Sequence, residues 1–121
     1  MRHLPKHLQP RWRYLAVEVE SPPDGRIGED ALQRAIWYAT QNLLGDPGSA
    51  AVDGRIVRFD GDRPARATVR VRRGHVPEAR AAIACVDTVD GVTAGPVVRG
   101  VAGTIRACEE KYMNGDRVDS T

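Results

Sequence analysis

The segment ARATVRVR at residues 65–72 decides the predicted fold. Small and β-branched apolar residues alternate along it with polar residues, and this period of two is typical of a β-strand with one buried face. The apolar side chains would face the core. The opposite face of the strand would then carry Arg66, Arg70 and Arg72.

The segments on either side of this strand predict a sheet with helices. Periods of two indicate strands, and apolar residues at i, i+3, i+4 and i+7 indicate amphipathic helices. The expected elements, in chain order, are a strand at residues 11–20, a helix at residues 28–44, a loop at residues 45–49, a strand at residues 55–59, a turn at residues 60–64, the strand at residues 65–72, a helix from Pro77 to about residue 87, a strand at residues 97–102 and a helix from residue 103.

This order of elements predicts an α+β fold. Because each of the first two helices has one apolar stripe, both can cover the same face of a four-stranded antiparallel sheet. The result is a ferredoxin-like or RRM-like βαββαβ sandwich with an added C-terminal helix. At 121 residues the chain has the length of one domain, which we expect at residues 1–113, with a basic N-terminal arm at residues 1–11 and a polar tail at residues 114–121.

Neither a membrane segment nor a secretory signal is visible in the sequence. No stretch approaches the roughly 20 apolar residues of a membrane helix, and the first residues lack the apolar run of a signal peptide. Cys85 and Cys108 lie far apart in predicted helices, and we expect both to be buried, reduced thiols. The sequence therefore predicts a cytoplasmic protein.

Basic residues are concentrated in two parts of a nearly neutral chain. The formal net charge is +2, yet 16 of the 18 basic residues are arginine, whose planar guanidinium group grips phosphate with two hydrogen bonds and stacks on bases. Residues 1–13 and residues 63–75 contain no acidic residue. These two basic segments predict a local site for a polyanion, and we expect that polyanion to be RNA.

The arginine row on the strand at residues 65–72 has two interpretations. The guanidinium groups of Arg66, Arg70 and Arg72 repel one another unless something neutralises them. Nucleic-acid phosphates would do so, and Arg73 and His75 would extend the contact. The alternative is a solvated face on which each arginine has an Asp or Glu partner on a neighbouring strand.

Aromatic residues suggest two further contacts. Trp12 and Tyr14 alternate with arginines, and they either stack on RNA bases or pack against a helix. Trp37 and Leu44 lie on a second stripe of the predicted helix at residues 28–44, away from its core-facing stripe of residues 32, 35, 36, 39 and 43. That stripe either caps a loop or forms an interface with a partner protein.

Motifs of enzymes are not found in the sequence. The phosphate-binding GxxxxGKS/T, the nucleophile elbow GxSxG and the zinc-binding HExxH do not occur, and the three histidines lack the spacing of metal ligands. Glu109 and Glu110 are expected to be surface charges, with Arg106 and Glu110 forming an i,i+4 pair. We therefore expect no catalytic residue, no metal site and no enzymatic activity of the chain by itself.

Three segments carry a resemblance to a known family. They are LPKHLQPRWRYL at residues 4–15, TVRVRRGHV at residues 68–76 and RGVAGTIRACEEKY at residues 99–112. Together they resemble the family of archaeal ribonuclease P protein component 2, kin to the eukaryotic Pop-five and Rpp-fourteen subunits. The arginine bias is most similar to the versions from halophilic archaea.

The resemblance implies a protein subunit of ribonuclease P, the ribonucleoprotein endonuclease that removes the 5′ leader from precursor tRNA. It implies that the RNA subunit and its Mg²⁺ ions perform the hydrolysis, while the protein holds no cofactor and supports the catalytic RNA. The implied partners are ribonuclease P RNA, precursor tRNA indirectly, ribonuclease P protein component 3 and other ribonuclease P proteins, in a two-plus-two hetero-oligomer. The residues expected to contact RNA are Lys6, Arg11, Arg13, Arg66, Arg70, Arg72, Arg73, His75, Arg99 and Arg106.

Two other functions are compatible with the same residues. A ferredoxin-like regulatory domain would use the arginine row to bind an anionic small molecule in a concave pocket. A structural, ribosome-associated protein would use the same arginines on ribosomal RNA.

Overall fold

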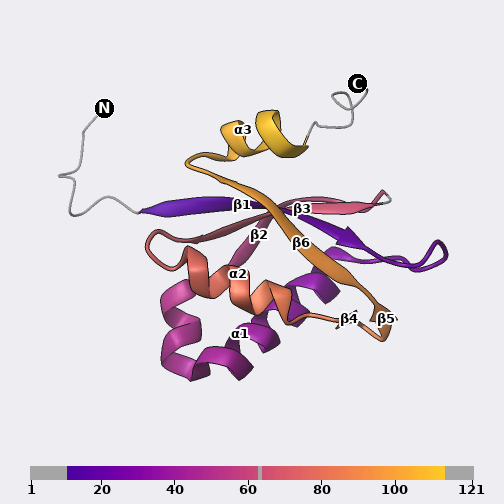
Figure 1. The fold of residues 1–121 in the computed structure, drawn as a ribbon, viewed down its shortest axis with the longest axis horizontal. Coiled ribbons are helices and arrows are strands. Elements are labelled where there is room, and N and C mark those ends of the chain that lie inside the picture. The colour runs from indigo at the N-terminus through magenta and orange to yellow at the C-terminus, as the bar shows by residue number, and fades with distance from the viewer. Residues whose placement is uncertain (1–10, 63, 114–121) are drawn as a thin grey trace.

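The computed structural model describes residues 11–62 and 64–113, and within them a four-stranded sheet lies between two layers of helix (Figure 1). In chain order the elements are β1 (Trp12–Glu20), α1 (Glu29–Val52), β2 (Arg55–Asp60), β3 (Ala65–Arg72), α2 (Val76–Ala84), β4 (Thr88–Val89), β5 (Val92–Thr93), β6 (Gly95–Ala102), α3 (Ile105–Cys108) and a π-helical turn at Glu109–Met113. The predicted N-terminal arm, apart from Arg11, and the predicted C-terminal tail lie outside the described residues.

The four strands follow the order β2-β3-β1-β6, and every neighbouring pair is antiparallel. The two connections that contain α1 and α2 each pass over one strand before the chain rejoins the sheet. This is the βαββαβ topology of a ferredoxin-like fold, so the predicted α+β class is confirmed. The short β4–β5 hairpin was not predicted, because two-residue strands are too short for a period to be seen.

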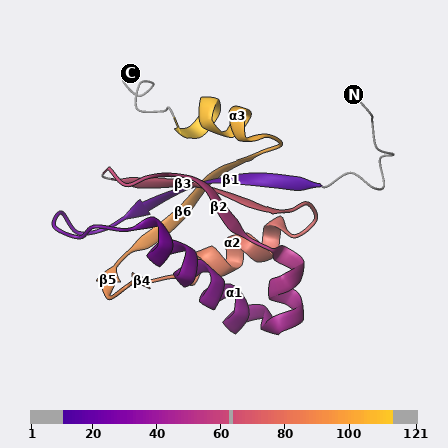
Figure 2. The same ribbon diagram turned by 180° about the vertical axis from the view of Figure 1, so that it is seen from behind.

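The hydrophobic core lies between the sheet and the pair α1 and α2, which cover the same face of the sheet in both views (Figures 1 and 2). Alternate residues of β1 and β3 point into this layer, as their period of two predicted. Burying each of the large side chains contributes about 1.5–3 kcal/mol. Among the most completely buried are Leu15, Val17, Val19, Leu32, Val69, Val71 and Ile83.

The added helix α3 lies on the opposite face of the sheet (Figures 1 and 2). Cys108 is completely buried there, as are Thr68 on β3 and Ala16 on β1. The Tyr112 ring lies over Gly100 on β6, where an added Cβ would overlap the ring. The middle of the sheet is therefore covered on both faces, and only its margins are left for contacts on the α3 side.

The first helix is longer than the sequence predicted. The chain bends at Gly45, which has φ +77° and ψ 178°, and then continues as helix to Val52. Glycine adopts a positive φ without steric cost, and Pro47 is tolerated because it lies in the first turn after the bend. The predicted loop at residues 45–49 is therefore wrong: these residues form the bend and the start of a second helical segment.

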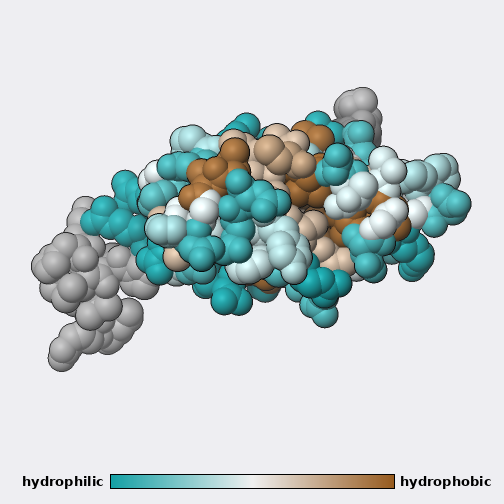
Figure 3. Space-filling view, turned by 90° about the horizontal axis from the view of Figure 1, so that it is seen from below, coloured by the Kyte–Doolittle hydropathy of each residue, from teal (hydrophilic) through white to brown (hydrophobic). Residues whose placement is uncertain are grey.

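Two predictions about burial are also wrong. Leu43 was assigned to the core-facing stripe of α1, but it is 46% exposed just before the bend. Cys85 is exposed at the C-terminal end of α2, whereas Cys108 is buried as expected. Apolar side chains consequently reach the surface on the helical side of the molecule, where they form a band among hydrophilic residues (Figure 3).

Candidate nucleic-acid interface

The arginines of β3 share one face of the sheet, and two of them rest on one tryptophan. In the register of β1 and β3, Trp12 lies opposite Arg72 and Tyr14 opposite Arg70. The Cζ atom of Arg70 is 4.0 Å from the centroid of the Trp12 ring, and that of Arg72 is 5.2 Å away. Each such cation–π contact at a partly exposed site contributes about 0.5–1 kcal/mol. Trp12 thus orients both guanidinium groups.

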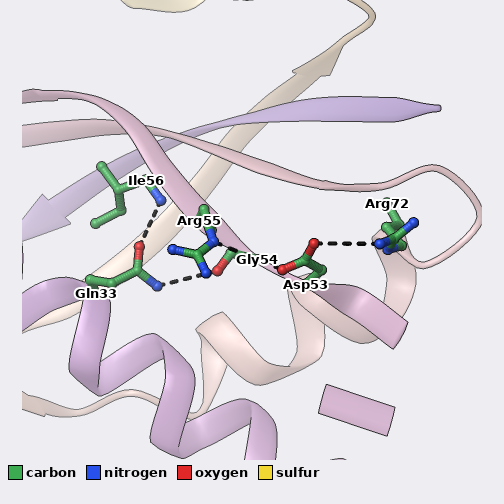
Figure 4. A network of polar contacts seen from close by, with 6 residues as sticks. All are labelled: Gln33, Asp53, Gly54, Arg55, Ile56 and Arg72. Carbon is green, nitrogen blue, oxygen red and sulfur yellow. Dashed lines mark hydrogen bonds and ion pairs between the residues drawn. The ribbon is translucent and has the colours of Figure 1, made fainter. Parts of the chain in front are cut away.

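Acidic partners around these two arginines are few and distant. Arg70 makes no ion pair with a described residue, and its Nε is buried there without a hydrogen-bond partner. Arg72 lies 3.7 Å from Asp53, which also lies 3.9 Å from Arg55 (Figure 4). Pairs of this length between exposed side chains are worth about 0–1 kcal/mol. A phosphate can therefore displace Asp53 at little cost.

Arg66, at the other end of β3, has a different environment. The strand register places Glu18 of β1 on one side of it and Asp60 of β2 on the other. Nearby, Arg99 of β6 already holds Glu18, with 2.7 Å between Nε and Oε1. The alternative interpretation, in which each arginine of the row has an acidic neighbour, therefore applies at the end of the sheet with Arg66 and Arg99. It does not apply at the end with Arg70.

Further basic residues gather where β1 begins and β3 ends. The backbone N–H of Arg73 donates to the carbonyl of Arg11 at 2.9 Å, which holds these two residues side by side. Arg13 follows on β1 and donates to the carbonyl of Trp12 at 3.0 Å. We call this group the arginine end of the sheet, and define it as Arg11, Trp12, Arg13, Arg70, Arg72 and Arg73.

The other predicted contacts lie apart from the arginine end or have partners of their own. His75 precedes α2 and lies 3.6 Å from Glu78. Arg106 of α3 pairs with Glu110 at 3.0 Å, as its spacing predicted. Lys6 lies outside the described residues. The structure thus brings together five of the predicted RNA contacts and separates Arg66, Arg99 and Arg106 from them.

Two arginines of β2 were missed by the sequence analysis. Arg55 and Arg58 lie opposite Arg70 and Thr68 of β3, so both share the arginine face. A bulge between residues 56 and 58 produces this placement, because strict alternation would send them to opposite faces. A bulge leaves no clear signal in a sequence, and Arg58 in turn pairs with Glu109 at 3.2 Å.

Titratable groups in the described part of the chain give no sign of a metal centre. No group of three or more His, Cys, Asp or Glu residues there is placed to hold a metal ion. Burial raises the pKa of the Cys108 thiol, and the charge of Glu109 adds to that rise. None of the helices in residues 11–62 and 64–113 is long and apolar enough to span a bilayer.

The two residues of the predicted protein interface, Trp37 and Leu44, differ in exposure. Leu44 is half-buried and packs against the hydrophobic core, so it offers little surface. Trp37 is 48% exposed and contacts Tyr38 edge-on, with ring centroids 5.2 Å apart. The exposed large apolar residues of α1 are therefore Trp37, Tyr38 and Leu43.

Comparison with known proteins agrees with this architecture. Residues 13–113 match the Rpp14/Pop5 family. The chain is 58% identical over 118 residues to ribonuclease P protein component 2 of Natronomonas pharaonis, covering 95% of this chain and 72% of that protein. It is 56% identical to the protein of the same name from Haloarcula marismortui, with the same coverage, and 35% identical to that of Thermococcus gammatolerans, covering 93% of this chain and 95% of that protein.

A solved structure shows the same fold at much lower identity. The chain superposes on a chain from a cryo-EM structure of yeast ribonuclease MRP with a TM-score of 0.65 at 14% identity, covering 95% of this chain and 98% of the other. The resemblance inferred from the three sequence segments is confirmed by the family match over most of the chain and by the identity to archaeal relatives. This protein belongs to the Rpp14/Pop5 family.

Proposed function

We propose that the chain is a protein subunit of ribonuclease P and that it binds RNA through the arginine end of its sheet. The names of its relatives support the first part. One observation carries the second: Arg70 and Arg72 are held on the Trp12 ring, and Arg70 has no acidic partner among the described residues. RNA phosphates would supply the missing negative charge.

The geometry of the arginine end suits a nucleic-acid backbone. Guanidinium groups that are already oriented lose less entropy when they bind phosphate than free side chains do. Each phosphate that they neutralise releases counterions, so binding should weaken steeply with salt. Arg66, Arg99 and Arg106 have acidic neighbours and should add less to the affinity than Arg70 and Arg72.

In this proposal the protein supports catalysis and does not cut RNA itself. The RNA subunit and its Mg²⁺ ions would perform the hydrolysis of the precursor tRNA, in the cytoplasm, and the protein would bind no cofactor. Incubating the purified chain with precursor tRNA and Mg²⁺ should then give no 5′ cleavage. Adding ribonuclease P RNA and the remaining proteins should restore it.

We further propose ribonuclease P protein component 3 as the protein partner, in a two-plus-two assembly. Its contact is expected beside Trp37 and Leu44, the interface residues predicted from the sequence. The proposed contact surface is a groove of about 610 Å³ between α1 and the segment that follows α2. Tyr38 and Leu43 line this groove together with Cys85 and Val86. Their exposed apolar area is typical of a surface that a partner covers.

The RNA-binding proposal is tested with two double variants of equal charge. R70A/R72A removes both oriented arginines, while R26A/R80A removes two exposed arginines outside the arginine end. Binding to a ribonuclease P RNA transcript is measured by filter binding over a range of salt concentrations. The first variant should lose at least about 10-fold in affinity, and its salt slope should fall by up to about two units.

The control separates a local contact from a general effect of charge. R26A/R80A should retain nearly all of the affinity and the full salt slope. Equal losses in the two variants would refute a specific role for the arginine end. A preference for a ribosomal RNA fragment over ribonuclease P RNA would instead refute the assignment to ribonuclease P.

A further inference from the structure

A second concave surface lies where α1 bends back towards the sheet. The two helical segments on either side of Gly45, together with the start of β2, enclose a cleft of about 560 Å³. This volume is within the range of small-ligand sites, about 300–1,000 Å³. Residues that line it include Trp37, Gln41, Asp46, Ser49, Asp53 and Arg55.

Hydrogen bonds hold the walls of this cleft in place. The Gln33 side chain donates to the carbonyl of Gly54 at 3.2 Å and accepts from the N–H of Ile56 at 2.7 Å, which ties α1 to the start of β2 (Figure 4). Gln41 and Asp46 are joined across the bend by a hydrogen bond of 2.5 Å. A cleft with fixed walls costs little reorganisation when a ligand enters it.

The residues around the cleft favour a flat, polar, uncharged ligand. Trp37 offers an exposed aromatic surface, and Tyr38 supports it edge-on. Two arginines, Arg34 and Arg55, are balanced by the two acids Asp46 and Asp53 in the lining, so the cleft carries no net charge for a phosphate. Nucleobases have a face that stacks on aromatic rings and edges that hydrogen-bond to carboxylate and amide groups.

The cleft is continuous with the arginine end. Asp53, at its rim, lies within 4 Å of both Arg55 and Arg72 (Figure 4). Arg72 in turn lies over the Trp12 ring. A nucleic-acid strand whose phosphates follow these arginines around the edge strand β2 would therefore pass the mouth of the cleft. This contact at Asp53 favours RNA over a protein partner as the occupant, because the lining of the apolar groove beside Leu43 and Cys85 includes neither Asp53 nor a residue of the arginine end.

We propose that the cleft at the bend of α1 binds one unpaired base of the RNA whose backbone lies on the arginine end. This inference rests on the proposed RNA-binding function. The stretch of RNA would be single-stranded, because only an unpaired base can leave its stack and enter a side pocket. Trp37 would be the stacking residue.

The two tryptophans of the chain allow this inference to be tested separately from the proposed function. Because Trp12 and Trp37 are the only tryptophans, W12F leaves Trp37 as the sole reporter and W37F leaves Trp12. Each variant is titrated with a ribonuclease P RNA transcript from Natronomonas pharaonis, with free tryptophan as the correction for absorbed light. Quenching of both reporters, in step with binding measured by filter retention, is the expected result.

Affinity supplies an independent readout. W37A should weaken binding by about 5-fold or more, the effect of losing one stacked base. Its salt slope should stay unchanged, because no phosphate contact is removed. V97A on β6 is the control, since Val97 is an exposed apolar residue that does not line the cleft, and it should bind RNA normally.

Three results would overturn the inference, and each has a different consequence for the proposed RNA-binding function. Quenching of Trp12 without quenching of Trp37 would refute the base pocket and leave the arginine end intact. Quenching of Trp37 only after the other ribonuclease P proteins are added would assign the cleft to a protein. Absence of binding by both variants and by the unaltered chain would refute the proposed function together with the pocket.

Discussion

Replacing Asp53 by asparagine should make the protein bind RNA more tightly. Asp53 is the carboxylate that lies near both Arg55 and Arg72, and it competes with phosphate for them. D53N removes the charge and keeps the shape of the side chain. The backbone at Asp53 is left-handed, with φ 49° and ψ 52°, and asparagine is one of the few residues that adopt this conformation readily.

The size of the effect follows from distance and exposure. Two unit charges about 4 Å apart in water interact with about 1 kcal/mol. Side-chain entropy and solvent reduce this, because the arginine side chains are 68% and 54% exposed and that of Asp53 is 31% exposed. Loss of both pairs therefore releases about 0.4–1.4 kcal/mol, which corresponds to binding about 2- to 10-fold tighter at low salt.

Asp90 provides a matched control. It is the other non-glycine residue with a positive φ among residues 11–62 and 64–113, it is exposed in the β4–β5 turn, and no ion pair joins it to a described arginine. D90N thus makes the same change in charge on the same backbone conformation, far from the arginine end. Both variants are compared with the unaltered chain in filter binding to ribonuclease P RNA at several salt concentrations.

Salt dependence makes this prediction refutable. The gain of D53N should shrink as salt rises and vanish near 1 M, where the screening length is about 3 Å. D90N should show only the small gain that one unit of net charge gives. If D53N binds RNA less tightly than the unaltered chain, or if D90N gains as much, then Asp53 does not compete with phosphate and the proposed role of Arg72 is wrong.

Three further predictions concern the packing at Gly100 and the two thiols. G100A should lower stability by about 1–3 kcal/mol in thermal unfolding, because the new Cβ would meet the Tyr112 ring, while G95A on the same strand meets no atom within 4 Å and should be tolerated. A smaller loss in G100A than in G95A would contradict this packing. In the folded protein, Cys85 should react with a thiol reagent and Cys108 should react only after unfolding. Because burial raises the pKa of Cys108, the thiol of the unfolded chain ionises at a lower pH than the thiol of the folded chain. In a C85S background, the stability that Cys108 contributes should therefore be complete below its ordinary pKa and be lost as the pH rises through the raised value. Equal labelling of Cys85 and Cys108 in the folded, unaltered protein would contradict the burial of Cys108.

The arrangement of the strands and helices could be predicted from the sequence. Alternation in β1 and β3 identified the faces of both strands, since a strand repeats every two residues whatever its partners are. The length of α1 could not be predicted, because Gly45 and Pro47 usually end a helix. Packing of the second helical segment, with Val52 in the core, outweighs that local preference.

The sequence by itself determined the fold class, the family and the presence of an arginine row on one face of β3. Only the tertiary structure decided which of those arginines are available to a ligand. Arg66 has Glu18 and Asp60 as neighbours, whereas Arg70 has the Trp12 ring. The reason is physical: a residue's side of a strand follows from local alternation, but its neighbours follow from strand register, which contacts between distant parts of the chain establish.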